Sequence, residues 1–338
     1  MFEQIWADLE REAVSSPEQG VLRRRILPNA PRGAFLGIEK PSSHRLMLLS
    51  ISSVDVVGGR GLPTGKRLTT SLQSYPGLPG SDTALALTCV DPAYQDMFSL
   101  VADDVAQHCA NVPDEAESVE RFIRRVRRWQ LFLEKFLPTG LSLEAQRGLF
   151  GELWFLWKHV LFEHEPDGAV GTWTGPERDR HDFQFPACSV EVKTTASKQH
   201  QRLHIASERQ LDDKNVGTLF LVNLSVDPQR HTGLTLPEIV ACIDEALADH
   251  IGAAEQFEAK LFASGYLRQQ SGLYDSTRYA ARKMEAFEVR EGFPRLTESD
   301  IPNGVGDVRY TVVVAECRHF LVAPEVLRQA IRRGTNAG

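Results

Sequence analysis

The chain has 338 residues, of which 42% are hydrophobic and 25% are charged, and its formal net charge is −7 at pH 7. This composition is that of an ordinary globular protein, and no apolar run reaches the roughly 20 residues that a bilayer-spanning helix needs. The five cysteines are far apart and include no Cys-x-x-Cys, which argues against a disulfide framework or a zinc site and fits a cytoplasmic protein. Because the chain is acidic, any contact with a nucleic acid must depend on local basic groups, bound metal or a partner subunit.

Residues 1–113 are predicted to form a mixed, β-rich domain that begins with one helix. Alternating apolar runs bounded by glycine and proline predict strands at residues 45–52 and 83–90. The glycine-rich segment 58–66 between them ends in Gly-Lys, as a phosphate-binding loop does. However, Arg60 stands where such a loop needs glycine, and Arg67 replaces the hydroxyl residue. We therefore expect a surface loop there.

Residues 114–251 are predicted to form a second domain, which opens with a helix at 114–137. Apolar residues recur in it at steps of three and four, at Phe122, Val126, Trp129 and Leu133. A second stripe beside them is basic and consists of Arg121, Arg124, Arg125 and Arg128. This stripe is either a solvated charged face or a track for a phosphate backbone.

The rest of this domain predicts an α/β sandwich. A helix at 142–161, with Ser142 as its N-cap, is followed by strands at 182–185, 189–195 and 203–206. A short helix at 207–211, an apolar strand at 219–224 and a helix at 236–251 complete it. We expect the first three strands to form an antiparallel meander, with a crossover to the buried fourth strand. Residues 252–338 are predicted to be an α+β extension, with strands at 284–290 and 310–316 and a last helix at 324–333.

Three residues of the predicted sheet can do chemistry together: Asp182, Glu191 and Lys193. Side chains two apart on a strand point to the same side, roughly 6.5–7 Å apart, so Glu191 and Lys193 share a face. Asp182 lies on the strand before them, and the turn at 186–188 brings the two strands together. The two carboxylates can share a magnesium ion, and the Val192 carbonyl can supply a further oxygen ligand. Lys193 can then orient or deprotonate the attacking water in a phosphodiester hydrolysis.

Glu-x-Lys alone is a weak signal, because the chain contains two similar segments without this context. Residues 258–260 lie in a helical pattern, where residues two apart do not share a face, and residues 212–214 have no flanking strand. From the residues alone, a metal site and a surface ladder of salt bridges both remain open. His181, His200 and His204 cluster nearby without a convincing metal-ligand pattern, and neither Ser197 nor Ser207 lies in a Gly-x-Ser-x-Gly turn.

The order of several motifs along the chain resembles the PD-(D/E)XK nuclease superfamily. More narrowly, it is similar to the "PD-(D/E)XK motif protein" family that is found with prokaryotic restriction and phage-defence genes. The resemblance covers residues 142–250 and extends more loosely through Phe293 and Tyr310. It implies a restriction-endonuclease-like core, which is a four-stranded mixed sheet flanked by helices. The motifs are Gly148-Leu-Phe-Gly-Glu152, Trp173-Thr-Gly-Pro176, His181-Asp182-Phe183, Glu191-Val-Lys193 and the segment 205–211.

The resemblance also implies roles for individual residues. Asp182 and Glu191 become metal ligands, Lys193 the catalytic lysine, and Glu152 a further metal-binding acid on the helix before the sheet. Gln210 takes the place of a polar active-site residue of some branches. For Glu152 a solvent-exposed helix face, and for Gln210 a purely structural role, remain the alternatives. The chain departs from the family pattern at His181, which stands where proline precedes the aspartate.

These observations predict a Mg²⁺-dependent DNA endonuclease, with Mn²⁺ as an alternative metal, in a restriction or anti-phage system. A DNA repair or recombination nuclease is an alternative within the same class. A catalytically inactive nuclease fold that binds nucleic acid or a partner subunit is an alternative from another class. The resemblance further implies other subunits of a defence system as partners, and a homodimer.

Overall fold

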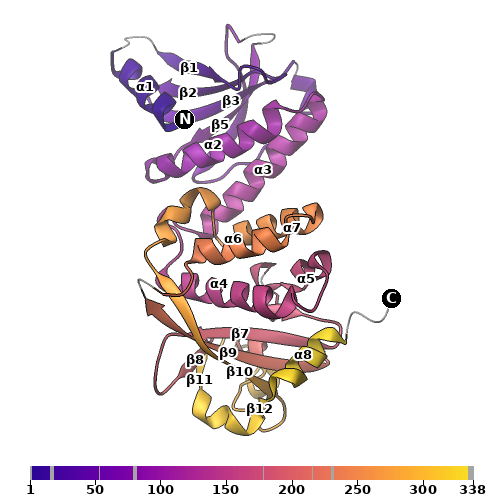
Figure 1. Ribbon diagram of the computed structural model, residues 1–338. Coiled ribbons are helices and arrows are strands. Elements are labelled where there is room, and N and C mark those ends of the chain that lie inside the picture. Colours follow the sequence, from indigo (N-terminus) through magenta and orange to yellow (C-terminus); the bar gives the residue numbers. More distant parts are fainter. Residues whose placement is uncertain are drawn as a thin grey trace. The chain divides into compact units, whose positions relative to one another are not determined.

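The computed structural model describes residues 2–15, 19–52, 54–78, 82–177, 179–214, 216–229 and 232–333. The chain divides into two compact units, Met1–Thr139 and Gly140–Gly338 (Figure 1). The helix expected at 114–137 falls in the first unit because it packs against another helix there, whereas the sequence division placed it at the start of the second domain. Residues 252–333 belong to the second unit, because their strands complete its sheets.

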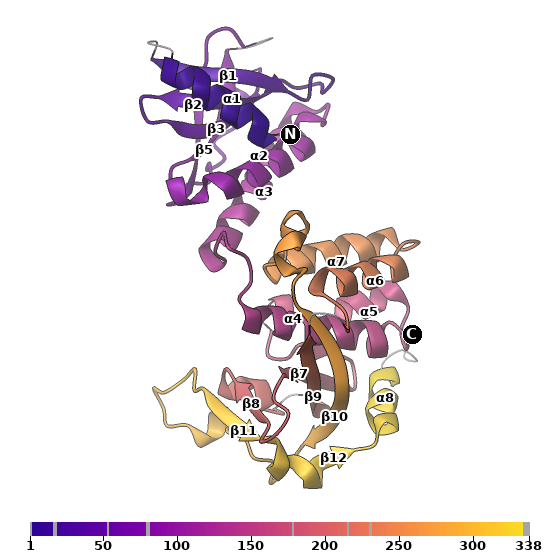
Figure 2. The ribbon, with the colours of Figure 1, turned by 60° about the vertical axis from the view of Figure 1, so that its left-hand side comes forward.

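The first unit is a five-stranded antiparallel sheet with helices, in the strand order β1-β2-β3-β5-β4. α1 and α2 pack on the sheet and α3 packs against α2 (Figure 2). The strands expected at 45–52 and 83–90 are confirmed as β3 and β5. The elements are α1 (Phe2–Ser15), β1 (Gly20–Ile26), β2 (Ala34–Lys40), β3 (His44–Ser50), β4 (Leu68–Ser74), β5 (Thr83–Cys89), α2 (Gln95–Ala110) and α3 (Glu115–Lys135).

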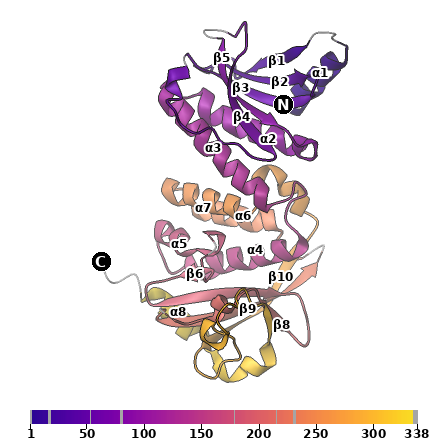
Figure 3. The same cartoon turned by 180° about the vertical axis from the view of Figure 1, so that it is seen from behind.

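The second unit is built on a mixed sheet of five strands, in the order β12-β10-β9-β7-β6. β7 and β9 are parallel and the other neighbours are antiparallel. α4 to α7 lie over one face of this sheet, while α8 and a two-stranded sheet of β8 and β11 lie on the other side (Figures 1 and 3). The elements are α4 (Leu143–Phe155), α5 (Pro166–Thr172), β6 (Phe183–Gln184), β7 (Cys188–Thr195), β8 (Arg202–Ile205), β9 (Thr218–Gln229), α6 (Leu236–Ala246), α7 (Ile251–Ala263), β10 (Arg278–Val289), β11 (Tyr310–Val313), β12 (Leu321–Val322) and α8 (Pro324–Arg332).

This α/β architecture agrees with the expected class, but the expected meander of the first three strands is wrong in its third strand. The strand at 203–206 does not continue the main sheet: as β8 it pairs with β11, more than a hundred residues later. Instead β9 lies beside β7 and β10 beside β9. The burial of the strands explains the difference. β9 is buried on both faces and needs a central place, whereas β8 alternates between exposed and buried residues and suits a small sheet with one exposed face.

Two further boundaries differ from expectation. The helix expected at 236–251 is two helices, because α6 ends at Ala246 and α7 begins at Ile251. The strand expected at 310–316 is shorter, because a 3-10 turn begins at Val314. Ser142 caps α4 as expected, accepting a hydrogen bond from the backbone N–H of Ala145. No helix in the described part of the chain is long and apolar enough to cross a membrane.

Gly151 lets α4 approach β7 closely. A Cβ at this position would overlap Thr194 Oγ1 and would lie 3.0 Å from Thr194 Cβ. Rotation of the threonine side chain cannot relieve the second contact, because Cβ does not move with χ1. The next residue of α4 is Glu152, so this contact also sets how near that carboxylate comes to β7.

We expect Gly151→Ala to destabilise the protein by about 1–3 kcal/mol, the usual cost of overpacking. Gly148→Ala is the matched control, because it lies in the same helix and a Cβ there meets nothing within 4 Å. That substitution should instead stabilise the helix by roughly 0.5–1 kcal/mol. Chemical denaturation of both variants measures the difference, and equal effects of the two substitutions would contradict the close-approach argument.

Candidate active site

The centre of the candidate site is the pair Glu191 and Lys193 on β7. Their side chains lie on the same side of the strand, and Lys193 Nζ is 2.7 Å from Glu191 Oε1. Glu191 is only 1% exposed. Val190, which precedes the pair, and Val192, which lies between its two members, are buried on the other side of the strand, as alternation along a strand requires. The pair is therefore held rigidly by a buried strand.

Asp182 joins this pair from the edge of the sheet, just before β6. Its Oδ2 atom accepts a hydrogen bond of 2.8 Å from the backbone N–H of Val192. Its backbone carbonyl accepts hydrogen bonds from the N–H groups of Thr174 and Gly175, at 2.8 and 3.0 Å. The Asp182 carboxylate is thus fixed beside β7 at the level of Lys193, as the sequence predicted for neighbouring strands.

Glu152 reaches the same place from α4. Its Oε2 atom accepts a hydrogen bond of 2.9 Å from Trp173 Nε1. A Cβ at Gly175 would lie 2.9 Å from Glu152 Oε2 and 3.0 Å from Asp182 Oδ1, so the missing side chain leaves a small space that borders both carboxylates. Any larger residue at this position would fill it.

The turn that carries Trp173 and Gly175 is itself anchored from α7. Lys260 is 3% exposed and its ammonium group donates hydrogen bonds to the Trp173 carbonyl and, at 2.8 Å, to Glu177 Oε1. The segment 258–260, which the sequence separated from the catalytic pattern, therefore has a structural task. Its lysine supports the turn that positions two of the acids.

Gln210 contacts the lysine directly. Its Oε1 atom accepts a hydrogen bond of 3.1 Å from Lys193 Nζ and one of 2.7 Å from the backbone N–H of Ala206. Lys193 is therefore held between Glu191 and Gln210. Of the residues that the resemblance singled out, Glu152, Asp182, Glu191, Lys193 and Gln210 all come together here.

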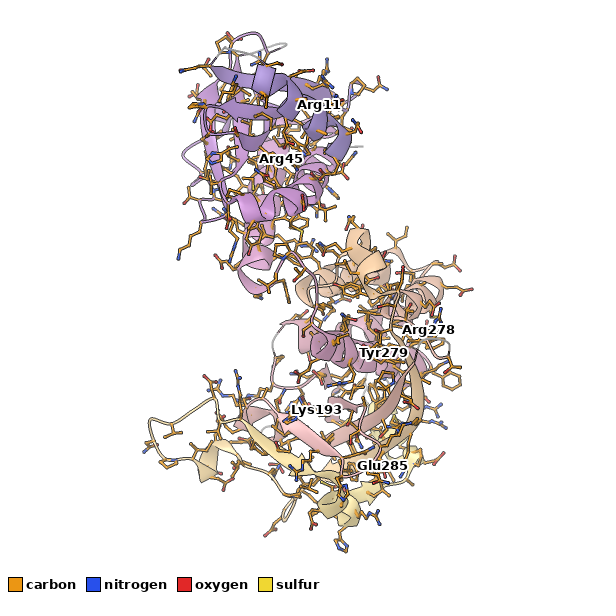
Figure 4. All side chains as sticks on the ribbon, turned by 90° about the vertical axis from the view of Figure 1, so that its left-hand side faces the viewer. Arg11, Arg45, Lys193, Arg278, Tyr279 and Glu285 are labelled. Carbon is orange, nitrogen blue, oxygen red and sulfur yellow. The ribbon has the colours of Figure 1, made fainter. Side chains whose placement is uncertain are left out.

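A cleft of about 900 Å³ opens on this cluster. Glu152, Asp182, Val192, Lys193 and Gln210 line it, whereas Glu191 lies behind Lys193 and does not. The cleft is bounded by α4 on one side and by β8 and β11 on the other, and Figure 4 labels Lys193 between them.

Burial raises the pKa values of all three carboxyl groups, and repulsion by a neighbouring carboxylate adds to this for Glu191 and Glu152. Desolvation, and then the charge of Asp182, raises the pKa of Glu191 to about 8. Desolvation and the charge of Asp182 raise the pKa of Glu152 well above its usual range, and desolvation raises that of Asp182 against the opposing effect of Lys193. Burial alone would lower the pKa of Lys193, but Glu191 and Asp182 outweigh it and raise that pKa. The lysine is therefore an ammonium ion near neutral pH, among acids that resist ionisation.

The donor set of the cluster suits a hard divalent cation. Its side chains offer carboxylate oxygens, the ligands that Mg²⁺ prefers, and Glu191 Oε2 has no hydrogen-bond partner within the described residues. Among those residues no three His, Cys, Asp or Glu side chains are already arranged as a metal site. Magnesium does not need such a cage, because it is often held by one or two carboxylates and keeps several waters. Asp182 and Glu152, which line the cleft, are the residues best placed to hold it, and the carboxylate of Glu191 lies behind them.

The other candidates take different places. His181 is buried next to Asp182, while His200 and His204 line the cleft. The arginine stripe of α3 lies in the first unit and is engaged with other groups of that unit. Arg121 and Arg125 form ion pairs of 2.6 Å with Glu117 and Asp104, Arg124 lies 4.0 Å from Glu120, and Arg128 also has a partner. Ion pairing is what a solvated charged face would show, and a phosphate-binding role for the stripe stays a prediction.

Sequence analysis missed three basic residues that line the cleft: Arg147, Arg202 and Arg309. The alternation of Arg202 and His204 with buried Leu203 and Ile205 is a signal that could have indicated an exposed polar face. Arg309 had no such signal, because only the pairing of β8 with β11 brings it to the site.

The chain belongs to the family DUF4420, which is described as "Putative PD-(D/E)XK family member" and whose model matches residues 2–315. The match runs through both units, and so extends well beyond the segment on which the sequence resemblance rested. The mixed sheet among helices is consistent with the PD-(D/E)XK fold. Comparison with curated proteins and with solved structures gave no match.

The raised pKa of Glu191 predicts that the stability of the protein falls as the pH rises. Between the ordinary value of 4.5 and about 8, the folded protein keeps a proton on Glu191 that the unfolded chain loses. The free energy of unfolding should therefore decrease in this window, by at most about 1.4 kcal/mol per pH unit for one proton. Glu191→Gln should reduce this slope, so that the variant gains stability relative to the wild type between pH 5 and pH 8.

Urea denaturation at several pH values measures the slope, in buffers without divalent cations. Glu255→Gln, which changes an exposed carboxylate on α7, is the control and should follow the wild type. Parallel curves for wild type and Glu191→Gln would mean that Glu191 carries no extra proton in the folded state.

Proposed function

We propose that the cleft is the active site of a divalent-cation-dependent nuclease that hydrolyses phosphodiester bonds in DNA. The observation that carries this proposal is the convergence of Glu152, Asp182 and Glu191 on Lys193 at the end of an open cleft. Membership of the PD-(D/E)XK-like family supports a nuclease in general. DNA as the substrate, and a place in a restriction or anti-phage system, stay predictions from the sequence resemblance.

Each side chain of the cluster has a distinct task in this proposal. Asp182 and Glu152 present oxygen atoms to the cleft and would hold the cation. The sequence predicted Glu191 and the Val192 carbonyl as further ligands, and both stay part of this proposal. The ammonium group of Lys193 would lie beside the scissile phosphate. There it would offset the negative charge that develops on the phosphate oxygens and orient the attacking water. Glu191 and Gln210 keep that ammonium group in place.

A bound Mg²⁺ or Mn²⁺ would supply a water of lowered pKa and stabilise the charge on the leaving oxygen. In the hydrolysis, the water oxygen forms a bond to phosphorus and the bond from phosphorus to one ester oxygen breaks. The leaving oxygen takes up a proton, and the products are an alcohol and a phosphomonoester.

Lys193→Ala and Asp182→Asn should each reduce DNA cleavage by at least about 100-fold, the usual scale for loss of a group that acts on the reacting atoms. The assay follows plasmid, linear duplex and single-stranded DNA in Mg²⁺ or Mn²⁺. Lys198→Ala is the matched control, because this lysine is 70% exposed, pairs with Asp227 and does not line the cleft. Cleavage that survives both site substitutions would refute the proposed active site.

Metal binding can be tested without turnover. Mg²⁺ should raise the melting temperature of the wild type, because a ligand that binds only the folded state stabilises it, and this increase should be lost in Asp182→Asn. If the metal stabilises the wild type but no DNA is cut, a missing partner or a modified target becomes the explanation to test. If the metal has no effect and no DNA is cut, the inactive scaffold replaces the nuclease.

A further inference from the structure

Three arginines face the cleft without an acidic partner. Arg147 comes from α4, Arg202 from β8 and Arg309 from the residue before β11. Among the described residues, none of the three has a carboxylate within ion-pair distance. Other arginines of the chain are paired with carboxylates, for example Arg32 with Glu115, Arg268 with Asp244 and Arg278 with Glu238.

The small sheet of β8 and β11 explains why two of these arginines share one face. Leu203 and Ile205 of β8, with Val312 of β11, are buried in the core beneath the sheet. Because side chains alternate along a strand, Arg202 and His204 of β8 point away from this core. The strand register places His204 opposite Thr311, and Arg202 is the first residue of β8. By the same alternation, Arg309 lies on the face of Thr311. This outward face, consisting of Arg202, His204, Arg309 and Thr311, forms one wall of the cleft.

Arg147 lies on the opposite wall. It is on α4, one turn and a half before Glu152, and it lines the same cleft as the outward face of β8 and β11. The acids that line the cleft in the described structure are Glu144 and the two cluster acids Glu152 and Asp182. The cleft thus has cationic groups on both walls, and two of its three carboxylates, Glu152 and Asp182, lie near Lys193.

The cleft offers few groups of the kinds that stack on bases or read them through an amide. Its described lining contains no Phe or Trp; besides the imidazoles of His200 and His204, its one aromatic ring is that of Tyr310, which is partly buried against the core with its hydroxyl directed to the Leu296 carbonyl. Gln210 is the one amide that lines it within the same part of the chain, and it is already engaged with Lys193 and Ala206. Single-stranded nucleic acids are usually bound by stacking of successive bases on aromatic side chains, and the described lining offers no row of Phe, Tyr or Trp rings for this.

We propose that Arg147, Arg202 and Arg309 bind the phosphate backbone of a nucleic-acid duplex and carry it, without readout of bases, to the carboxylate cluster. Guanidinium groups suit this task because they bind phosphate through two parallel hydrogen bonds. The inference rests on the proposed function for its substrate class. It adds that this cleft contacts the backbone alone, so that any choice of sequence must come from another part of the protein or from a partner.

The test is the salt dependence of binding by the full-length protein, followed by fluorescence anisotropy of a labelled DNA duplex. Ca²⁺ replaces Mg²⁺ so that binding is read without cleavage. Each of Arg147→Ala, Arg202→Ala and Arg309→Ala should weaken binding and lower the slope of log Kd against log salt by about 0.9, the value for one phosphate contact on a duplex. Arg202→Lys keeps the charge and should keep most of the slope.

Arg290→Ala is the matched control, because it removes an exposed arginine of the same unit that lies 4.0 Å from Glu288 and does not line the cleft, so it should leave the slope unchanged. Duplexes of unrelated sequence should bind alike. An unchanged slope in the triple alanine variant, preference for one duplex sequence that the triple variant loses, or tighter binding of single strands than of duplexes would each overturn the inference.

The outcome is separable from that of the proposed function. Arginine-dependent binding by a protein that cuts no DNA and gains no stability from Mg²⁺ would leave the inference standing and replace the nuclease by the inactive scaffold. DNA cleavage by the wild type, together with an unchanged salt slope in the triple arginine variant, would support the nuclease and refute the inference.

Discussion

The ionisable groups of the site carry charges that do not cancel within the protein itself. Three carboxyl groups, Glu152, Asp182 and Glu191, surround one ammonium group, so full ionisation would leave an excess of two negative charges in a place that water reaches poorly. Burying unpaired charge is costly, and the folded protein responds by raising the pKa values of the acids. A divalent cation has the charge that would cancel the excess. The same arrangement therefore explains both the resistance of these acids to ionisation and their suitability as metal ligands.

The surrounding structure keeps these repelling groups together. Each acid has a separate support: Glu152 the indole of Trp173, Asp182 the backbone of Val192, and Glu191 the ammonium of Lys193. The supports come from the turn at Trp173 and from β7, and β7 is packed closely against α4 where Gly151 meets Thr194. Lys260 contributes from α7 by fixing the turn around Trp173. The repulsion among the three acids lowers the stability of the fold, and packing contacts that take no part in the chemistry offset this cost.

Sequence reasoning recovered the centre of the site because local rules determine it. Alternation along β7 puts Glu191 and Lys193 on one side, and a short hairpin brings Asp182 beside them, so neither needs knowledge of the rest of the fold. The partner of β8 was not predictable in the same way, because a four-residue strand can pair with any neighbour and the correct one lies about a hundred residues later. For the same reason the position of Arg309 in the cleft could not be predicted. The boundary between the two units was shifted for a similar reason, since only the contact of α3 with α2 assigns that helix.

The overall charge of −7 and the cationic walls of the cleft are compatible, because what matters for a polyanion is the field where it binds. An arginine with an acidic partner has little attraction left for phosphate, and this describes Arg121 and Arg125 on α3. The guanidinium group of an arginine without an acidic partner is hydrated in the free protein. It exchanges this water for a phosphate group when the ligand binds. The density of basic residues along the sequence marked the α3 stripe, whose phosphate-binding role stays a prediction, whereas ion pairing among the described residues leaves Arg147, Arg202 and Arg309 without a carboxylate partner. An acidic protein can in this way hold a duplex where cations without a carboxylate partner gather in one cleft, and direct it to carboxylates that would repel it without a bound metal ion.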